Sequence, residues 1–173
     1  MMLPKLILTD IDGVWTDGGM YYSNDGIEFK KFNTSDSAGV LFCHILGIKV
    51  GIVTGENSEA VKKRAEKLKI EHVFVGVKNK KKVVETLLSN LGLNWNDVAY
   101  IGDDLNDIEV LQKARISATP QDAPDYIKKY AKVILSKNGG DGVFREFVEL
   151  IIEKENTEKA IEDYLKNLKS FSQ

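Results

Sequence analysis

Short apolar segments that end at polar loops alternate along this chain with segments whose apolar residues recur at helical spacing. Three of the apolar segments cover residues 6–9, 50–53 and 98–101. Strands buried on both faces are continuously apolar, whereas amphipathic helices show apolar residues every three or four positions. The alternation predicts an α/β protein with a Rossmann-like, doubly wound parallel sheet that is covered by helices on both faces.

The rest of the chain continues this pattern with one interruption, at residues 20–32. There Asp25-Gly26 separates two aromatic segments, which is a strong signal for a β-hairpin. We expect a core domain at 1–155, with the hairpin at about 18–32, and a helical tail at 156–173. Further strands are expected at 73–75, 116–118 and 133–135, and helices at 36–46, 60–68, 83–91, 108–113, 126–130 and 143–154.

Composition narrows the class of protein. The 173 residues are 43% hydrophobic and 29% charged, with a net charge of −2, which is ordinary for a globular domain. No basic stripe is present to neutralise nucleic-acid phosphates, and no apolar run of roughly 20 residues could span a membrane. We therefore expect a cytoplasmic protein without a nucleic-acid or membrane partner. The only cysteine, Cys43, lies in an apolar stretch and is expected to be buried.

Polar residues follow three of the expected strands. Ligands of open α/β sheets bind beyond the carboxyl ends of the strands, so these residues are expected to meet. Two like charges about 4 Å apart repel by roughly 4 kcal/mol at an effective dielectric of about 20, so the site must bind a cation or hold protons. Ligation by oxygen atoms alone suits Mg²⁺. The loops carry Asp10, Asp12, Gly13, Thr54, Gly55, Glu56, Asp103, Asp104 and Asp107, and Lys80 opens an intervening helix.

A magnesium site beside a hydroxyl and an ammonium group suits phosphoryl transfer, in which charge on the phosphoryl oxygens must be neutralised. Asp10 can act as a nucleophile that forms an aspartyl-phosphate, and Asp12 can then donate and accept protons. Each motif alone is also typical of a turn or a helix N-cap. Their combination, in this order and at strand ends or helix starts, favours a catalytic site.

These motifs, within residues 5–152, resemble those of the haloacid dehalogenase superfamily of phosphotransferases. The resemblance implies that Asp10 is the nucleophile and a Mg²⁺ ligand. It implies that Asp12 is the general acid/base and binds the metal through its backbone carbonyl. By the same resemblance, Thr54 and Lys80 hold the phosphoryl group and act in catalysis, Asp103 binds Mg²⁺, and Asp104 and Asp107 support the metal site.

Most members of this superfamily carry a cap domain, for which this chain has no room. Only 41 residues (13–53) separate Asp12 from Thr54, and only 22 (81–102) separate Lys80 from Asp103. The capless branch that the chain resembles forms tetramers, so we expect a homotetramer whose active sites are completed by neighbouring subunits. A lone hairpin is marginal in water, which favours pairing of 20–32 with neighbouring copies. Residues 139–145 either reach a neighbour's site or form a glycine-rich connector.

Within that branch the chain is similar to the phosphatases of sugar-acid biosynthesis, which act on phosphorylated 2-keto-3-deoxy sugar acids. Enzymes for 3-deoxy-D-manno-octulosonate 8-phosphate, in lipopolysaccharide biosynthesis, usually carry arginines at the positions of Leu41 and Glu56. A glutamate in place of an arginine reverses the charge, so we expect the 9-phosphate of the nonulosonate KDN, with the octulosonate as the alternative. The resemblance implies a substrate pocket of Asp12, Asn33, Thr34, Ser35, Asp36, Ser37, Thr54, Gly55, Glu56, Arg64 and Lys80, although Arg64 also suits a helix surface.

Two functions of other classes remain open. A phospho-acceptor regulatory domain also combines an aspartyl-phosphate site with Mg²⁺, a threonine and a lysine, but it lacks an acid/base residue two positions after the nucleophile. An inactive, phosphatase-like scaffold would have no need of the complete acidic set. Asp12 therefore argues against the first alternative, and the full set of motifs argues against the second.

Overall fold

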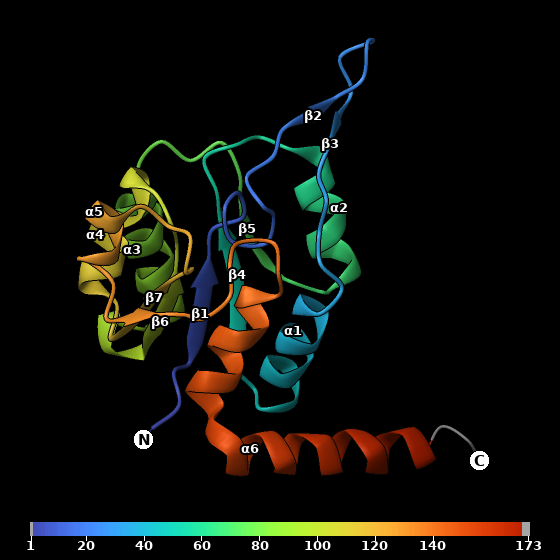
Figure 1. Ribbon diagram of the computed structural model, residues 1–173. Coiled ribbons are helices and arrows are strands. Elements are labelled where there is room, and N and C mark those ends of the chain that lie inside the picture. Colours follow the sequence, from blue (N-terminus) through green and yellow to red (C-terminus); the bar gives the residue numbers. More distant parts are fainter. Residues whose placement is uncertain (1, 171–173) are drawn as a thin grey trace.

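A six-stranded sheet forms the centre of the computed structural model, which describes residues 2–170 apart from the side chains of 154–155 and 167–170 (Figure 1). The strands lie in the order β5-β4-β1-β6-β7-β8, and all neighbouring pairs are parallel. Their bounds are Leu6–Thr9 (β1), Lys49–Val53 (β4), His72–Phe74 (β5), Val98–Ile101 (β6), Ile116–Thr119 (β7) and Val133–Ile134 (β8).

Helices cover both faces of this sheet (Figure 1). One face carries α1 (Asp36–Ile45), α2 (Glu59–Lys67) and α6 (Val143–Ser170). The other carries α3 (Lys80–Leu91), α4 (Ile108–Lys113) and α5 (Asp125–Lys128), with 3-10 turns at Trp95–Asp97 and Leu105–Asp107. Successive residues of β1 point to opposite faces, so that Ile7 joins the apolar core under α1 and α6 while Leu6 and Leu8 join the core under α3 and α4. The predicted doubly wound fold is confirmed.

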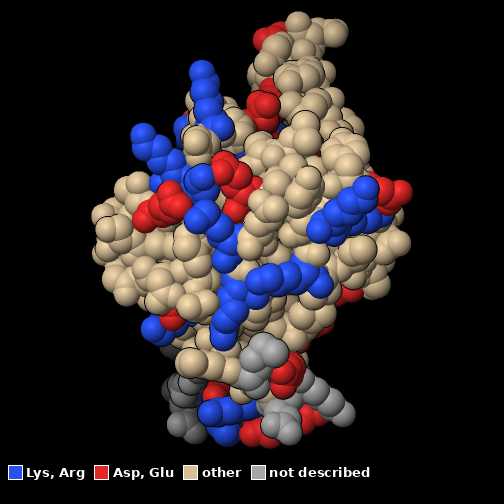
Figure 2. Space-filling view, turned by 90° about the vertical axis from the view of Figure 1, so that its left-hand side faces the viewer, with Lys and Arg blue, Asp and Glu red and all other residues tan. Residues whose placement is uncertain are grey.

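A hairpin projects from the body between β1 and α1 (Figures 1 and 2). It consists of β2 (Tyr21–Tyr22) and β3 (Glu28–Phe29), which pair antiparallel around the predicted Asp25-Gly26 turn. Most of its surface in Figure 2 carries neither acidic nor basic groups. In the described part of the chain this hairpin is the only insertion into the sheet-and-helix core, and no cap domain is present. Its exposed apolar side chains are Met20, Tyr21, Tyr22, Ile27 and Phe29.

The predicted strands and helices are found with end shifts of a few residues. We expected a helix that ends near residue 154, followed by a separate tail helix. The helical structure of α6 matches this expectation, because two helical segments are joined at a sharp kink at Glu153, whose φ of 59° and ψ of 168° are not helical. The helix therefore turns away from the body at Glu153, as Figure 1 shows. Among residues 2–170, no helix is both long and apolar enough to cross a bilayer.

Candidate active site

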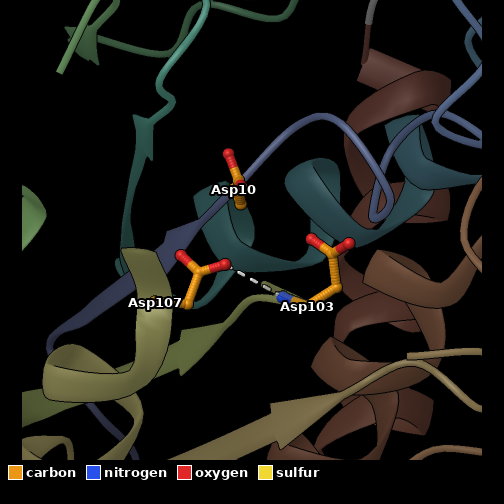
Figure 3. Close-up of side chains that lie close together, drawn as sticks. All are labelled: Asp10, Asp103 and Asp107. Carbon is orange, nitrogen blue, oxygen red and sulfur yellow. Dashed lines mark hydrogen bonds between the residues drawn. The ribbon is translucent and has the colours of Figure 1, made fainter. Parts of the chain in front are cut away.

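The carboxyl ends of β1, β4 and β6 meet at one edge of the sheet, because β1 lies between the other two strands. Asp10 follows β1, Thr54 follows β4, and Asp103 lies just beyond β6. The strand order reverses here, which is where open α/β sheets bind ligands. Asp10, Asp103 and Asp107 converge at this edge, and each offers a carboxylate oxygen within 4.8 Å of the others (Figure 3).

Asp107 is completely buried, and protein donors occupy both of its oxygens. Its Oδ1 accepts hydrogen bonds from the Tyr100 hydroxyl and from Lys80 Nζ, the latter at 2.6 Å. Its Oδ2 accepts from the backbone N–H groups of Asp103 at 3.0 Å and Asp104 at 3.1 Å. Because these bonds use its carboxylate fully, Asp107 fits the role of organising the loop after β6 better than that of a metal ligand.

Lys80 connects this loop to Asp10, the predicted nucleophile. Its ammonium lies 2.7 Å from Asp10 Oδ2, and its side chain is fully buried. Burial opposes the charge of Lys80, but the carboxylates of Asp10 and Asp107 outweigh burial and raise its pKa. The other Asp10 oxygen, Oδ1, accepts a hydrogen bond of 2.7 Å from the Ile11 N–H. The carboxylate of Asp10 is therefore held from two sides.

Asp103 has the free oxygen that a cation would need. Its Oδ1 is buried and has no hydrogen-bond partner among the described residues. The Asp103 carboxylate packs against Gly13, where an added Cβ atom would lie 1.9 Å from Asp103 Oδ2. Gly13 also has a φ of +81°, which favours glycine. The loop after β1 can thus approach Asp103 closely only because it has a glycine there.

The electrostatics of the cluster fit a divalent cation. Burial, together with the negative charge of Asp107, raises the pKa of Asp10 to about 7 in spite of Lys80. Burial, together with Asp10 and Asp107, raises the pKa of Asp103 to about 8. Both shifts arise first from burial and then from negative charge that the single lysine does not neutralise. Mg²⁺, which prefers oxygen ligands, would remove this penalty.

The Asp12 side chain turns toward the hairpin. Its Oδ1 accepts hydrogen bonds from Lys30 Nζ at 2.6 Å and from the Thr16 hydroxyl at 3.3 Å. Lys30 Nζ lies 3.3 Å from Glu28 Oε1 as well. Burial opposes the charge of Lys30, but Asp12 and Glu28 outweigh burial and raise its pKa. Lys30 was not among the residues that sequence reasoning selected.

Residues of the loop after β4 lie at the same edge. Thr54 is buried, while Gly55 and Glu56 are exposed. The Thr54 carbonyl accepts a hydrogen bond from the Val77 N–H at 3.0 Å, which links this loop to the chain leading into α3. Thr54 is thus fixed by its backbone on a rigid strand end, whereas Glu56 is open to an incoming molecule.

Arg64 is held by residues at the start of α1 instead of extending freely into solvent. Its Nη2 donates to Ser37 Oγ at 2.9 Å and to the Asn33 carbonyl at 3.3 Å. Its guanidinium carbon lies 5.8 Å from the centre of the Phe32 ring. Arg64, Asn33 and Ser37 therefore lie together, as a shared pocket requires, and their contact with substrate remains a prediction.

The other predicted pocket residues serve local structure in the chain as it stands. Asp36 is completely buried, and its Oδ1 accepts a hydrogen bond from the Arg145 N–H at 3.1 Å. The Ser35 N–H donates to Asn33 Oδ1 at 2.9 Å, and the Thr34 carbonyl accepts from the Ser37 N–H at 3.1 Å. For Asp36 this placement favours a structural role, because no part of the residue is open to a ligand.

The glycine-rich segment 139–142 packs on the loop after β1 of its own subunit. The Gly140 N–H donates to the Val14 carbonyl at 2.9 Å, and the Gly140 carbonyl accepts from Asn33 Nδ2 at 3.0 Å. Two residues after this segment, Phe144 packs on Trp15 with the ring centres 4.7 Å apart. The segment therefore supports the loop after β1 within the same chain.

Two supporting residues carried no signal in the sequence. Tyr100 sits in an apolar strand, where nothing indicates that its hydroxyl contacts Asp107. Trp15 donates its indole N–H to Thr9 Oγ1 at 3.0 Å, and Thr9 in turn donates to the Asp10 carbonyl at 2.6 Å. Both side chains are buried; Tyr100 contacts Asp107 directly, whereas Trp15 reaches the Asp10 backbone through Thr9.

Several known proteins are similar to this chain in sequence and in fold over most of their length. Residues 76–147 match the family model described as haloacid dehalogenase-like hydrolase. Over 172 residues the chain is 32% identical to the 3-deoxy-D-manno-octulosonate 8-phosphate phosphatase of Haemophilus influenzae. This alignment covers 98% of this chain and 96% of the relative.

Two solved structures extend the comparison. A probable YrbI family phosphatase from Pseudomonas syringae superposes with a TM-score of 0.90 at 38% identity, covering 94% of this chain and 93% of that protein. The octulosonate 8-phosphate phosphatase of Moraxella catarrhalis, solved with magnesium, phosphate and KDO, has a TM-score of 0.89 at 32% identity, covering 93% of each chain.

Proposed function

This chain belongs to the haloacid dehalogenase-like hydrolases, and we propose that it hydrolyses 3-deoxy-D-manno-octulosonate 8-phosphate. The chain is a phosphatase that acts on a phosphorylated sugar acid, and its cofactor is Mg²⁺. The similarity to the H. influenzae phosphatase across 96% of that protein carries the proposal of an eight-carbon substrate. It favours this substrate over the nine-carbon KDN 9-phosphate that the sequence led us to expect.

One observation keeps KDN 9-phosphate as a second candidate. Glu56 is exposed in the loop after β4, beside the catalytic edge, and Leu41 is partly exposed on α1. A carboxylate at position 56 would repel the acid group of a sugar acid that binds in the orientation suited to an arginine. A longer substrate could instead offer hydroxyl groups to Glu56.

The first chemical step in this proposal is attack by a carboxylate oxygen of Asp10 on the phosphorus atom. The bond between phosphorus and the sugar oxygen breaks, and Asp12 gives its proton to that oxygen, so that the sugar acid leaves as an alcohol. Lys80 and Thr54 bind the phosphoryl group in this proposal, which the 2.7 Å distance of Lys80 from Asp10 and the position of Thr54 after β4 support.

The second step returns the enzyme to its starting state. Water attacks the phosphorus atom of the aspartyl-phosphate while Asp12 accepts a proton from the water, and the bond between phosphorus and Asp10 breaks to release phosphate. Asp10, Asp103 and the backbone carbonyl of Asp12 would hold Mg²⁺, which neutralises charge on the phosphoryl oxygens when it is bound.

Relative kcat/KM values on the two sugar phosphates, measured with saturating Mg²⁺, test the substrate. We expect the octulosonate 8-phosphate to be preferred. A clear preference for KDN 9-phosphate would favour the second candidate, and hydrolysis of neither would refute both. If Glu56 contacts the nine-carbon sugar, Glu56→Gln should lower kcat/KM selectively for KDN 9-phosphate. Glu59→Gln, at an exposed residue on α2, is the control.

A further inference from the structure

Lys30 has a buried side chain on an element that is otherwise open to solvent. Its neighbour Phe29 is 55% exposed, whereas the Lys30 side chain is 0% exposed. The hairpin therefore turns the ammonium group of Lys30 inward. There the group meets Asp12, with a distance of 2.6 Å between Lys30 Nζ and Asp12 Oδ1.

The two oxygens of Asp12 differ in their surroundings. Oδ1 accepts the bond from Lys30 and a longer one, 3.3 Å, from the Thr16 hydroxyl. Oδ2 is buried and has no hydrogen-bond partner among the described residues. A bond between an ammonium and a carboxylate is shorter and stronger than a neutral one, so Lys30 largely determines how the carboxylate is turned.

Lys80, the lysine at the site that the sequence singled out, does not compete for this role. Its ammonium lies within 2.7 Å of Asp10 and 2.6 Å of Asp107. Each lysine therefore serves a different carboxylate, Lys80 the nucleophile and Lys30 the residue two positions later.

We propose that Lys30 is a positioning residue for general acid/base catalysis, which holds Oδ1 of Asp12 and leaves Oδ2 to exchange the proton. The inference rests on the proposed function, in which Asp12 is the acid/base residue. It gives the hairpin a part in the chemistry of its own chain, because Lys30 directly follows β3, which carries the exposed Phe29.

The alternative is a purely structural role, in which Lys30 only anchors the hairpin through Glu28 and Asp12. The leaving group separates the two accounts. A sugar alkoxide is a poor leaving group that needs a proton in the transition state, whereas p-nitrophenolate departs without one. Loss of a positioning residue for the proton donor therefore reduces kcat/KM selectively for the sugar phosphate.

The experiment compares wild type with Lys30→Met on the better of the two sugar phosphates and on p-nitrophenyl phosphate. We expect kcat/KM to fall on the order of tenfold to a hundredfold for the sugar phosphate, as part of the 10²–10⁴-fold typical of acid/base catalysis. For p-nitrophenyl phosphate we expect a change of less than about threefold. Lys31→Met is the matched control, because the Lys31 side chain is 71% exposed.

Two further variants keep the test decisive. Lys30→Arg retains a cation and should restore part of the selective loss. In an Asp12→Asn background, Lys30→Met should cause little additional loss, because residues that act as a unit are not additive. If Lys30→Met unfolds, as a thermal melt would show, Lys30→Arg must still show a smaller loss that depends on the leaving group.

Equal losses on both substrates, or losses that multiply with Asp12→Asn, would overturn the inference and leave Lys30 as an anchor. The proposed function fails in a different way, since wild type would then hydrolyse neither sugar phosphate. If wild type hydrolyses a sugar phosphate but the losses of the Lys30 variants do not depend on the leaving group, only the role of Lys30 is refuted.

Discussion

Gly13 lies where the loop after β1 passes the carboxylate of Asp103. In Gly13→Ala the new Cβ atom would overlap Asp103 Oδ2, at 1.9 Å, and one of the two groups would have to move. We expect the variant to need a much higher Mg²⁺ concentration for half-maximal activity, with a loss of kcat on the order of a hundredfold.

Gly26→Ala is the control for the backbone strain in that variant. Gly26 has a φ of +82°, almost the same as the +81° of Gly13, but nothing lies within 4 Å of an added Cβ atom. Backbone strain should cost each variant about 1 kcal/mol of stability, and only Gly13→Ala should change the response to Mg²⁺. An unchanged Mg²⁺ titration in Gly13→Ala would contradict the placement of Asp103 in the metal site.

Asp36 makes stability depend on pH. Burial raises its pKa from 3.8 to about 6, in spite of the Arg145 N–H and the charges of Arg64 and Lys137. The folded state therefore binds a proton more tightly than the unfolded state, and this contribution to stability is lost as the pH rises from about 4 to about 6. At about 1.4 kcal/mol per pKa unit, the loss is at most about 3 kcal/mol.

Asp36→Asn removes this titration and keeps an oxygen for the Arg145 N–H. We expect its free energy of unfolding, relative to wild type, to increase between pH 4.5 and pH 7, as measured by urea denaturation. A difference from wild type that stays constant across this interval would show that Asp36 does not titrate as its burial implies.

At the scale of the elements, periodicity in the sequence was sufficient for the sheet and for most helix positions. The segments 6–9, 98–101 and 108–113 have the predicted bounds, because apolar runs and polar loops mark their ends directly. The break between the body helix and the tail helix was predicted near residue 154, but the positive φ of Glu153 was not, since neither glycine nor proline marks the position.

Some residues of the candidate site could likewise be predicted from the sequence, and others could not. Asp10, Asp103 and Asp107 follow strand ends, so topology alone predicts that they meet, as their 4.8 Å cluster confirms. Lys30 lies on a hairpin whose direction depends on long-range contacts. Its ion pairs with Glu28 and Asp12 were therefore not predicted from the sequence.

Glu153 has backbone angles, φ 59° and ψ 168°, that are otherwise almost confined to glycine. We therefore expect Glu153→Gly to raise the free energy of unfolding by about 1 kcal/mol, because it relieves the strain. Lys159→Gly, at an exposed site within the second helical segment, should lower it by a similar amount. If Glu153→Gly destabilised the chain as much as Lys159→Gly, the helix would have to be straight at Glu153 in solution.

For the whole molecule, we propose a homotetramer that assembles through the hairpin. Its apolar side chains are between 42% exposed, at Met20, and 62% exposed, at Tyr22, and a two-stranded hairpin is marginal alone. Three further expectations stay predictions. They are active sites completed by neighbouring subunits, a division into a core at 1–155 and a tail at 156–173, and a cytoplasmic location.

Light scattering after size exclusion tests this assembly. We expect wild type at the mass of four chains, and Tyr22→Lys/Phe29→Lys at a lower mass with reduced activity. Tyr126→Lys, at a residue 53% exposed on α5, is the control and should leave the mass unchanged. A wild-type monomer with full activity would contradict both the assembly and the idea that neighbours complete the site.

We propose that Asp10 is the nucleophile of this magnesium-dependent phosphatase. The most direct measurement is Mg²⁺-dependent release of phosphate from the octulosonate 8-phosphate by wild type and by Asp10→Asn, with Asp17→Asn as a control in the same loop. We expect Asp10→Asn to lose on the order of 10³-fold or more in kcat and to form no acid-stable phosphoenzyme, while Asp17→Asn stays within about threefold of wild type. Phosphate release by Asp10→Asn at a rate near that of wild type would contradict the account.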